Sequence, residues 1–160
     1  MGINYYIGEY ILMNNYPKWW DTTVTVYNKF TDTQTQVITW YRTVINGCFW
    51  KDTGNKVTIN NVVLETNNII CRIRKDPKFL ERSEWVALPN DEMGNYFTLS
   101  PGDIIIRGSV DEDINEYKSG KRATDLTKKY KALQGCMEIQ AVTNNTGGGR
   151  GNEHYHVTGI

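Results

Sequence analysis

The sequence has few of the residues on which enzyme chemistry usually depends. It contains two histidines and three cysteines in 160 residues, and no serine or cysteine stands beside a histidine. Cys48, Cys71 and Cys136 are far apart and form no Cys-x-x-Cys pair. This spacing predicts reduced, buried thiols, and one disulfide plus a free thiol is the alternative. Together these absences predict no catalytic site and no cofactor, so the chain is not expected to be an enzyme.

An excess of one charge and long apolar runs are also missing. Eighteen basic residues balance eighteen acidic ones, which argues against a dedicated nucleic-acid binder because such proteins normally carry a basic excess. Residues 1–10 contain no lysine or arginine, and the apolar residues 11–13 stand between Glu9 and Asn14. No export signal and no membrane contact are therefore expected, and the interpretation is a soluble chain made in the cytoplasm.

What the sequence does contain is a series of short β-rich runs. In the first of them Val24 and Val26 alternate with Thr23, Thr25 and Tyr27, as in a strand with one buried face. The expected strands are residues 22–28, 36–45, 48–50, 56–65, 69–74, 84–88, 104–106, 136–142 and 153–158. Short strands at this spacing predict an all-β fold, a small antiparallel β-barrel or sandwich in one domain.

Turn residues divide these runs. Ser100-Pro101-Gly102-Asp103 predicts a type II turn, because proline fixes φ at the second position and glycine accepts positive φ at the third. The β-branched run 104–106 that follows predicts a central strand, ended by Arg107 and Gly108. Further turns or loops are expected at Asn46-Gly47, at residues 51–55 and at residues 66–68.

One helix is expected within a charged insertion at about residues 111–134. Leu126, Tyr130 and Leu133 are spaced to form one apolar stripe on a helix over residues 123–134. Thr124 is the expected N-cap, and Gly135 is the expected residue after the C-cap. The sequence therefore predicts a short helix inserted between strands.

The motifs that suggest binding chemistry are weak. The glycines at 147–151 lack the lysine and serine of a phosphate-binding loop and are followed by a strand, which favours a flexible hairpin loop. His154 and His156 lie on one face of a strand and can hold a metal only with a third ligand, for which Glu153 is conceivable. No metal site is predicted, and a solvent-facing or interfacial strand is the favoured interpretation.

The first twenty residues are aromatic and lack a clean period. They include the interface candidates Tyr5, Tyr6, Tyr10, Trp19 and Trp20. Two interpretations remain open, a segment that covers one edge of its own domain and an arm that docks on a neighbour. Residues 1–20 are accordingly taken as an extension of a single barrel domain at 21–160.

Five segments, residues 24–29, 40–50, 96–108, 124–130 and 154–159, carry a resemblance to a known family. They resemble head–tail connector proteins of tailed bacteriophages of Firmicutes, of the head-closure or stopper type. The resemblance covers residues 22–160 and rests on structural rather than catalytic motifs. It implies a virion protein of the neck, assembled in the host cytoplasm as a homo-oligomeric ring, a dodecamer or hexamer. The ring would lie between the portal or adaptor ring and the tail terminator and close the DNA-filled capsid.

If the ring encloses a channel, its charged insertion is the expected channel or inter-ring contact. The candidates are Asp111, Glu112, Asp113, Lys118, Lys121, Arg122, Lys128 and Lys129. The simpler interpretation is that these residues form a solvated loop and helix face. The more specific interpretation is that they contact an acidic neighbouring protein, or that they contact packaged DNA non-specifically. Two other functions stay open, a tail terminator or tail-completion ring and a carbohydrate-binding β-sandwich.

Overall fold

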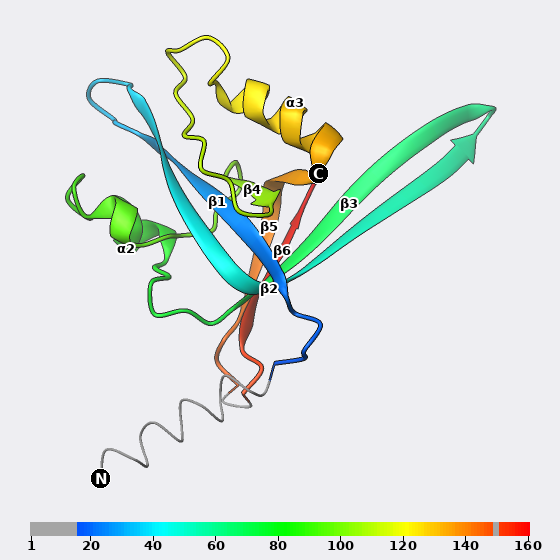
Figure 1. Ribbon diagram of the computed structural model, residues 1–160, viewed down its shortest axis with the longest axis horizontal. Coiled ribbons are helices and arrows are strands. Elements are labelled where there is room, and N and C mark those ends of the chain that lie inside the picture. The colour runs from blue at the N-terminus through cyan, green and yellow to red at the C-terminus, as the bar shows by residue number, and fades with distance from the viewer. Residues whose placement is uncertain (1–15, 149–150) are drawn as a thin grey trace.

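The computed structural model describes residues 16–148 and 151–160, which form a closed antiparallel β-barrel with one longer helix on its outside (Figure 1). Around the barrel the strands follow the order β1, β2, β3, β6, β5, β4. Their bounds are β1 Thr22–Thr31, β2 Ile38–Ile59, β3 Val62–Arg74, β4 Ile104–Arg107, β5 Cys136–Asn145 and β6 His154–Gly159. The predicted all-β fold is confirmed, as a barrel rather than a sandwich.

The barrel interior is filled by alternating apolar side chains. Val24 and Val26 of β1 belong to the interior cluster, whereas Tyr27 belongs to a second cluster outside the barrel, as the alternation predicts. Cys48 and Cys71 lie in the interior cluster and Cys136 in the outer one, and all three thiols are free and buried. The prediction of buried, unpaired thiols is confirmed.

The outer cluster forms where helix α3 (Ala123–Leu133) covers β1 and β4. Ile104 and Ile106 pack under Leu126 and Tyr130 of the helix, while Ile105 points into the barrel. Strand β4 is therefore buried on both faces, as predicted for a central strand. Leu133 is 66% exposed, so its place in the buried stripe is wrong.

Two local signals around β4 and α3 are confirmed and one is wrong. The Asp103 N–H donates to the Ser100 carbonyl at 3.0 Å and Gly102 has a φ of 93°, as the type II turn requires. Gly135, with a φ of 105°, follows the C-cap of α3. The helix begins at Ala123, within the expected range, but the expected N-cap Thr124 is wrong: Arg122 is the N-cap, and its N–H donates to the Asp125 carboxylate at 3.2 Å.

The strand expected at residues 84–88 is wrong, because a short helix, α2 (Arg82–Val86), lies there. Trp85 is fully buried, and its indole N–H donates to the Met93 carbonyl in the 3₁₀ turn η1 (Met93–Asn95). The residues around Trp85 have high β propensity, but they form a helix that buries the Trp85 ring and not a strand. Neither α2, α3 nor any other helix of the described residues is long and apolar enough to cross a membrane.

The hairpin boundaries predicted in the second quarter of the chain are wrong. β2 runs without a break through Asn46-Gly47 and residues 51–55, with Gly47 at φ 71° opposite a register shift in β1. The chain reverses instead at Asn60 and Asn61, whose φ angles are 50° and 62°. That turn lies inside the run expected as one strand over residues 56–65, and the turn expected at 66–68 lies within β3. One long hairpin replaces several short ones.

Candidate interaction surfaces

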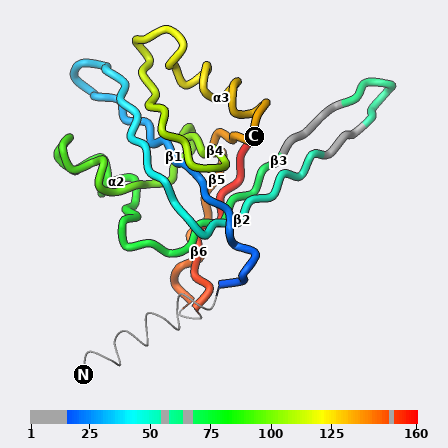
Figure 2. The backbone as a smooth tube through the Cα atoms, in the orientation of Figure 1, coloured from blue at the N-terminus to red at the C-terminus, as the bar shows by residue number. Residues whose placement is uncertain are grey.

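The β2–β3 hairpin extends far beyond the barrel wall (Figures 1 and 2). β1 pairs with β2 only as far as Cys48, and β6 pairs with β3 only from Ile69 onward. Residues 53–59 and 62–68, here called the distal hairpin, pair with each other alone. Within the described residues, neither long edge of the distal hairpin has a strand partner. An isolated two-stranded ribbon is at best marginally stable in water.

The tip of the distal hairpin is apolar and exposed. Ile59, Val62 and Val63 are 53%, 58% and 57% exposed. Residues 57–64 contain no charged side chain, although charges are the usual protection of an exposed strand edge. An uncharged, β-branched tip with open edges has the properties of a surface that another chain covers.

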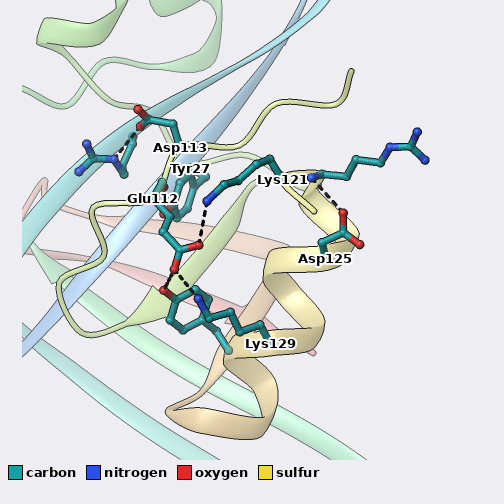
Figure 3. A network of polar contacts seen from close by, with 9 residues as sticks. Tyr27, Glu112, Asp113, Lys121, Asp125 and Lys129 are labelled. Carbon is teal, nitrogen blue, oxygen red and sulfur yellow. Dashed lines mark hydrogen bonds and ion pairs between the residues drawn. The ribbon is translucent and has the colours of Figure 1, made fainter. Parts of the chain in front are cut away.

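The charged insertion, by contrast, is largely neutralised by its own contacts (Figure 3). The Glu112 carboxylate accepts hydrogen bonds from the Lys129 ammonium at 2.6 Å, the Lys121 ammonium at 3.5 Å and the Tyr130 hydroxyl. The hydrogen bonds from Lys129 and then Tyr130 lower the pKa of Glu112 to about 2. This network fastens the start of the insertion to α3.

The other side of the same segment is bound to β1 and β2. The Arg42 guanidinium donates to the Asp113 carboxylate at 2.9 Å and to the Val110 carbonyl at 3.1 Å. The Tyr27 hydroxyl donates to the Glu112 carbonyl at 2.7 Å. Asp113 and Glu112 therefore hold the insertion against the barrel, a role that the sequence did not indicate.

The loop that follows is also attached. The Trp40 indole N–H donates to the Glu116 carboxylate at 2.9 Å, and the Ile38 N–H donates to the Tyr117 hydroxyl at 2.8 Å. The insertion is a cover over the outer cluster rather than a free loop. Six of the eight channel candidates are exposed, namely Asp111, Asp113, Lys118, Arg122, Lys128 and Lys129. Of these, Asp113 and Lys129 are engaged in ion pairs with Arg42 and Glu112.

The aromatic leader enters the described structure at Tyr16, so the candidates Tyr5, Tyr6 and Tyr10 lie outside the described residues. Trp20 is buried, with its ring stacked on Phe49 and the edge of His154 against it. Trp19 is 58% exposed and meets Phe49 edge-on at 5.2 Å. Trp20 therefore packs on its own barrel, while Trp19 leaves most of its indole available.

The two histidines lie on the outer side of β6, as their spacing predicts. The Arg72 Nε donates to His156 Nδ1 at 3.4 Å, and burial together with the Arg72 charge lowers the pKa of His156. Glu153, the conceivable third ligand, pairs with the Lys75 ammonium at 2.9 Å. No group of three or more potential ligands able to hold a metal occurs in the part of the chain that the structure describes.

One polar site was missed from the sequence. Asp103 is buried, and its carboxylate accepts hydrogen bonds from Lys29 N–H at 2.9 Å, Asn28 Nδ2 at 2.9 Å and Ser100 N–H at 3.1 Å. Burial raises the pKa of Asp103 to about 6. Arg82 lies 3.8 Å away at the side of an open cleft of about 780 Å³. The cluster joins the type II turn and α2 to β1.

Comparison with known proteins assigns the chain to a family but adds no function. A family model described as a family of unknown function, DUF6751, matches residues 19–160. No curated protein and no solved structure matches the chain. The matched span begins at Trp19 and includes the barrel, the distal hairpin and α3.

Proposed function

This chain belongs to the DUF6751 family, whose function is unknown, and we propose that it is a structural virion protein of a tailed bacteriophage. Copies of the chain form a ring at the head–tail interface, which closes the DNA-filled capsid and joins it to the tail. The ring lies in the neck, between the portal or adaptor ring and the tail terminator. In this role the chain performs no reaction.

The distal hairpin is the observation that carries the assembly part of the proposal. It reaches beyond its own barrel, its tip exposes Ile59, Val62 and Val63, and its edges are open. A projecting element that docks on a different surface of the next copy makes a head-to-tail contact, and such contacts close into rings when the rotation allows it. The distal hairpin is thus the element by which each subunit holds its neighbour.

The phage part of the proposal is supported by the resemblance of five sequence segments to head–tail connectors. These segments fall in β1, in β2, in the turn leading to β4, in α3 and in β6. They belong to the barrel and its covering helix, and none includes residues 53–68. The shared part would be the ring body, while the distal hairpin would be particular to this family.

The assembly is tested with the purified full chain by light scattering after size-exclusion chromatography and by negative-stain electron microscopy. We expect rings of six or twelve copies. A matched variant replaces residues 53–68 by Asn-Gly, which joins the paired positions Asp52 and Ile69 and leaves the pairing with β1 and β6 intact. It should remain folded and become monomeric. A wild-type chain that stays monomeric at high concentration would refute the proposal.

The phage assignment is tested separately. Portal and major capsid genes upstream and tail genes downstream are the expected gene neighbours, and mass spectrometry should detect the chain in mature virions. Copurification with isolated tails instead of filled heads would assign it to the alternative, a tail terminator. Binding on a glycan array together with absence from virions would instead favour the carbohydrate-binding alternative.

A further inference from the structure

Strands β2, β3, β6 and β5 share an outer face on the opposite side of these strands from the barrel core. The register aligns Phe49, Arg72, His156 and Thr143 in one row across the four strands. Neighbouring rows on the same side contain Arg74, His154 and Asn145, and Lys51, Ile70, Thr158 and Ala141. We call these eleven positions the basic face, because they include three Lys or Arg residues, two histidines and no carboxylate.

Two carboxylates adjoin the face along the chain, and neither belongs to it. Asp52 follows Lys51 but pairs with Ile69, in a row that alternates to the other side of β2. Glu153 precedes His154 and pairs with the Lys75 ammonium at 2.9 Å, outside the basic face. The helix and the charged insertion cover β1 and β4 instead, so they do not mask this side of the barrel. The positive charge of Lys51 and Arg72 is therefore not balanced on the face itself.

The donors of this face are held in place before any ligand arrives. The Arg72 guanidinium carbon lies 5.2 Å from the centre of the Phe49 ring, and Arg72 Nε donates to His156 Nδ1. Since Nδ1 accepts, the proton of the neutral imidazole is on Nε2, which is a donor. Within the described residues the terminal guanidinium nitrogens of Arg72 make no hydrogen bond. Arg72 and His156 thus offer adjacent N–H groups of the kind that bind phosphate oxygens, and exposed Lys51 stands in the next row of the face.

We propose that the basic face binds the phosphodiester backbone of double-stranded DNA without reading its sequence. Proteins that bind single strands add free aromatic rings on which bases stack. Here the Phe49 ring is already enclosed by Arg72, Trp19 and Trp20, so it offers no stacking platform. The exposed part of the Trp19 ring beside it has room to stack one base and not a run of bases. Backbone contact by cationic donors is the mode that remains. This site is separate from the distal hairpin and does not depend on ring assembly.

The test is fluorescence anisotropy of a labelled duplex of arbitrary sequence with the full-length chain, over a series of salt concentrations. We expect an affinity that falls with salt, because each phosphate contact contributes about 0.9 to the slope of log K against log salt. Lys51→Gln with Arg72→Gln should reduce the slope by about 2 and the low-salt affinity by about tenfold or more. The matched control, Lys118→Gln with Lys128→Gln, removes the same charge from the α3 side and should change neither.

A second variant guards against misfolding of the first. Thr143→Glu leaves Arg72 and Lys51 in place, adds a carboxylate to an exposed position beside His156, and should also weaken DNA binding. No duplex binding at low salt, or equal losses in the control and the Lys51/Arg72 variant, would overturn the proposal. Tighter binding to a single strand than to the duplex would overturn the double-stranded assignment. Ring formation, measured in the same samples by light scattering, reports on the proposed function independently.

Discussion

Replacing the three apolar tip residues of the distal hairpin by threonine should weaken assembly without weakening the fold. Fully burying one valine or isoleucine stabilises a structure by about 1.5–3 kcal/mol. Ile59, Val62 and Val63 are 53%, 58% and 57% exposed, so roughly half of that gain, about 1 kcal/mol per residue, is left for a neighbour to supply. The triple variant should therefore lose about 3 kcal/mol per interface, which corresponds to about a hundredfold in Kd.

Threonine is the appropriate replacement because it is β-branched and keeps the strand propensity of the tip. The assay is light scattering across a dilution series, which gives the concentration at which the assembly dissociates. Urea unfolding of the monomer, measured in parallel, should change by less than about 0.5 kcal/mol, as is usual for exposed positions. Val37→Thr is the matched control, since Val37 is 46% exposed but lies in the β1–β2 connection.

Two results would refute this reasoning. If the triple variant assembles at the wild-type concentration, the tip does not lie in the interface. If instead the free energy of unfolding of the monomer falls by about 3 kcal/mol, the tip side chains stabilise the fold of one chain and not an interface.

Three further predictions concern stability. Glu112→Gln should lower the free energy of unfolding by about 1–2 kcal/mol at neutral pH, because it weakens the charge-assisted hydrogen bond from Lys129. The pKa of Glu112 is lowered from 4.5 to about 2. Urea unfolding of the wild type should therefore show the stabilisation by Glu112 disappear as the pH falls from about 4.5 to about 2. The pKa of Asp103 is raised from 3.8 to about 6, so its contribution to stability should fall as pH rises from about 4 to about 6, a slope that Asp103→Ala should abolish. Gly159→Ala should lower the free energy of unfolding, measured by thermal melting, by about 3 kcal/mol or more, because the added Cβ would collide with the Glu138 carbonyl oxygen. Gly147→Ala is the control and should lower it far less, because a Cβ at Gly147 meets no atom within 4 Å.

Features decided by neighbours in sequence could be predicted. Pro101 followed by Gly102 favours the backbone of a type II turn through local geometry alone. The β-branched run 104–106 that follows this turn predicts a strand with apolar neighbours on both faces. Leu126 and Tyr130 predict the buried stripe of α3 because one helical turn separates them. The barrel follows from the number and spacing of such strands, although the sequence alone did not separate it from a sandwich.

Features decided by pairing at a distance could not be predicted. Asn46-Gly47 is a strong hairpin signal, yet pairing with β1 on both sides of Gly47 keeps β2 continuous and turns the signal into a bulge. Asn60-Asn61 makes the actual turn because asparagine tolerates positive φ. The distal hairpin was therefore hidden inside a run that resembled a single strand. The α2 helix was missed for the same reason, since the contacts that bury Trp85 are made by Phe30, Tyr41 and Met93.

The zero net charge of the chain does not describe how its charges are distributed over the surface. A net charge of zero argues against a nucleic-acid binder only if the two signs are mixed over the whole surface. In the folded chain Glu112 neutralises Lys121 and Lys129 beside α3, and Asp113 neutralises Arg42 next to them. These two carboxylates are thus paired beside α3, and Lys51 and Arg72 remain on a face whose eleven positions include none. Because the Debye length is about 8 Å at physiological ionic strength, a polyanion on that face would respond to these cations and not to the total charge.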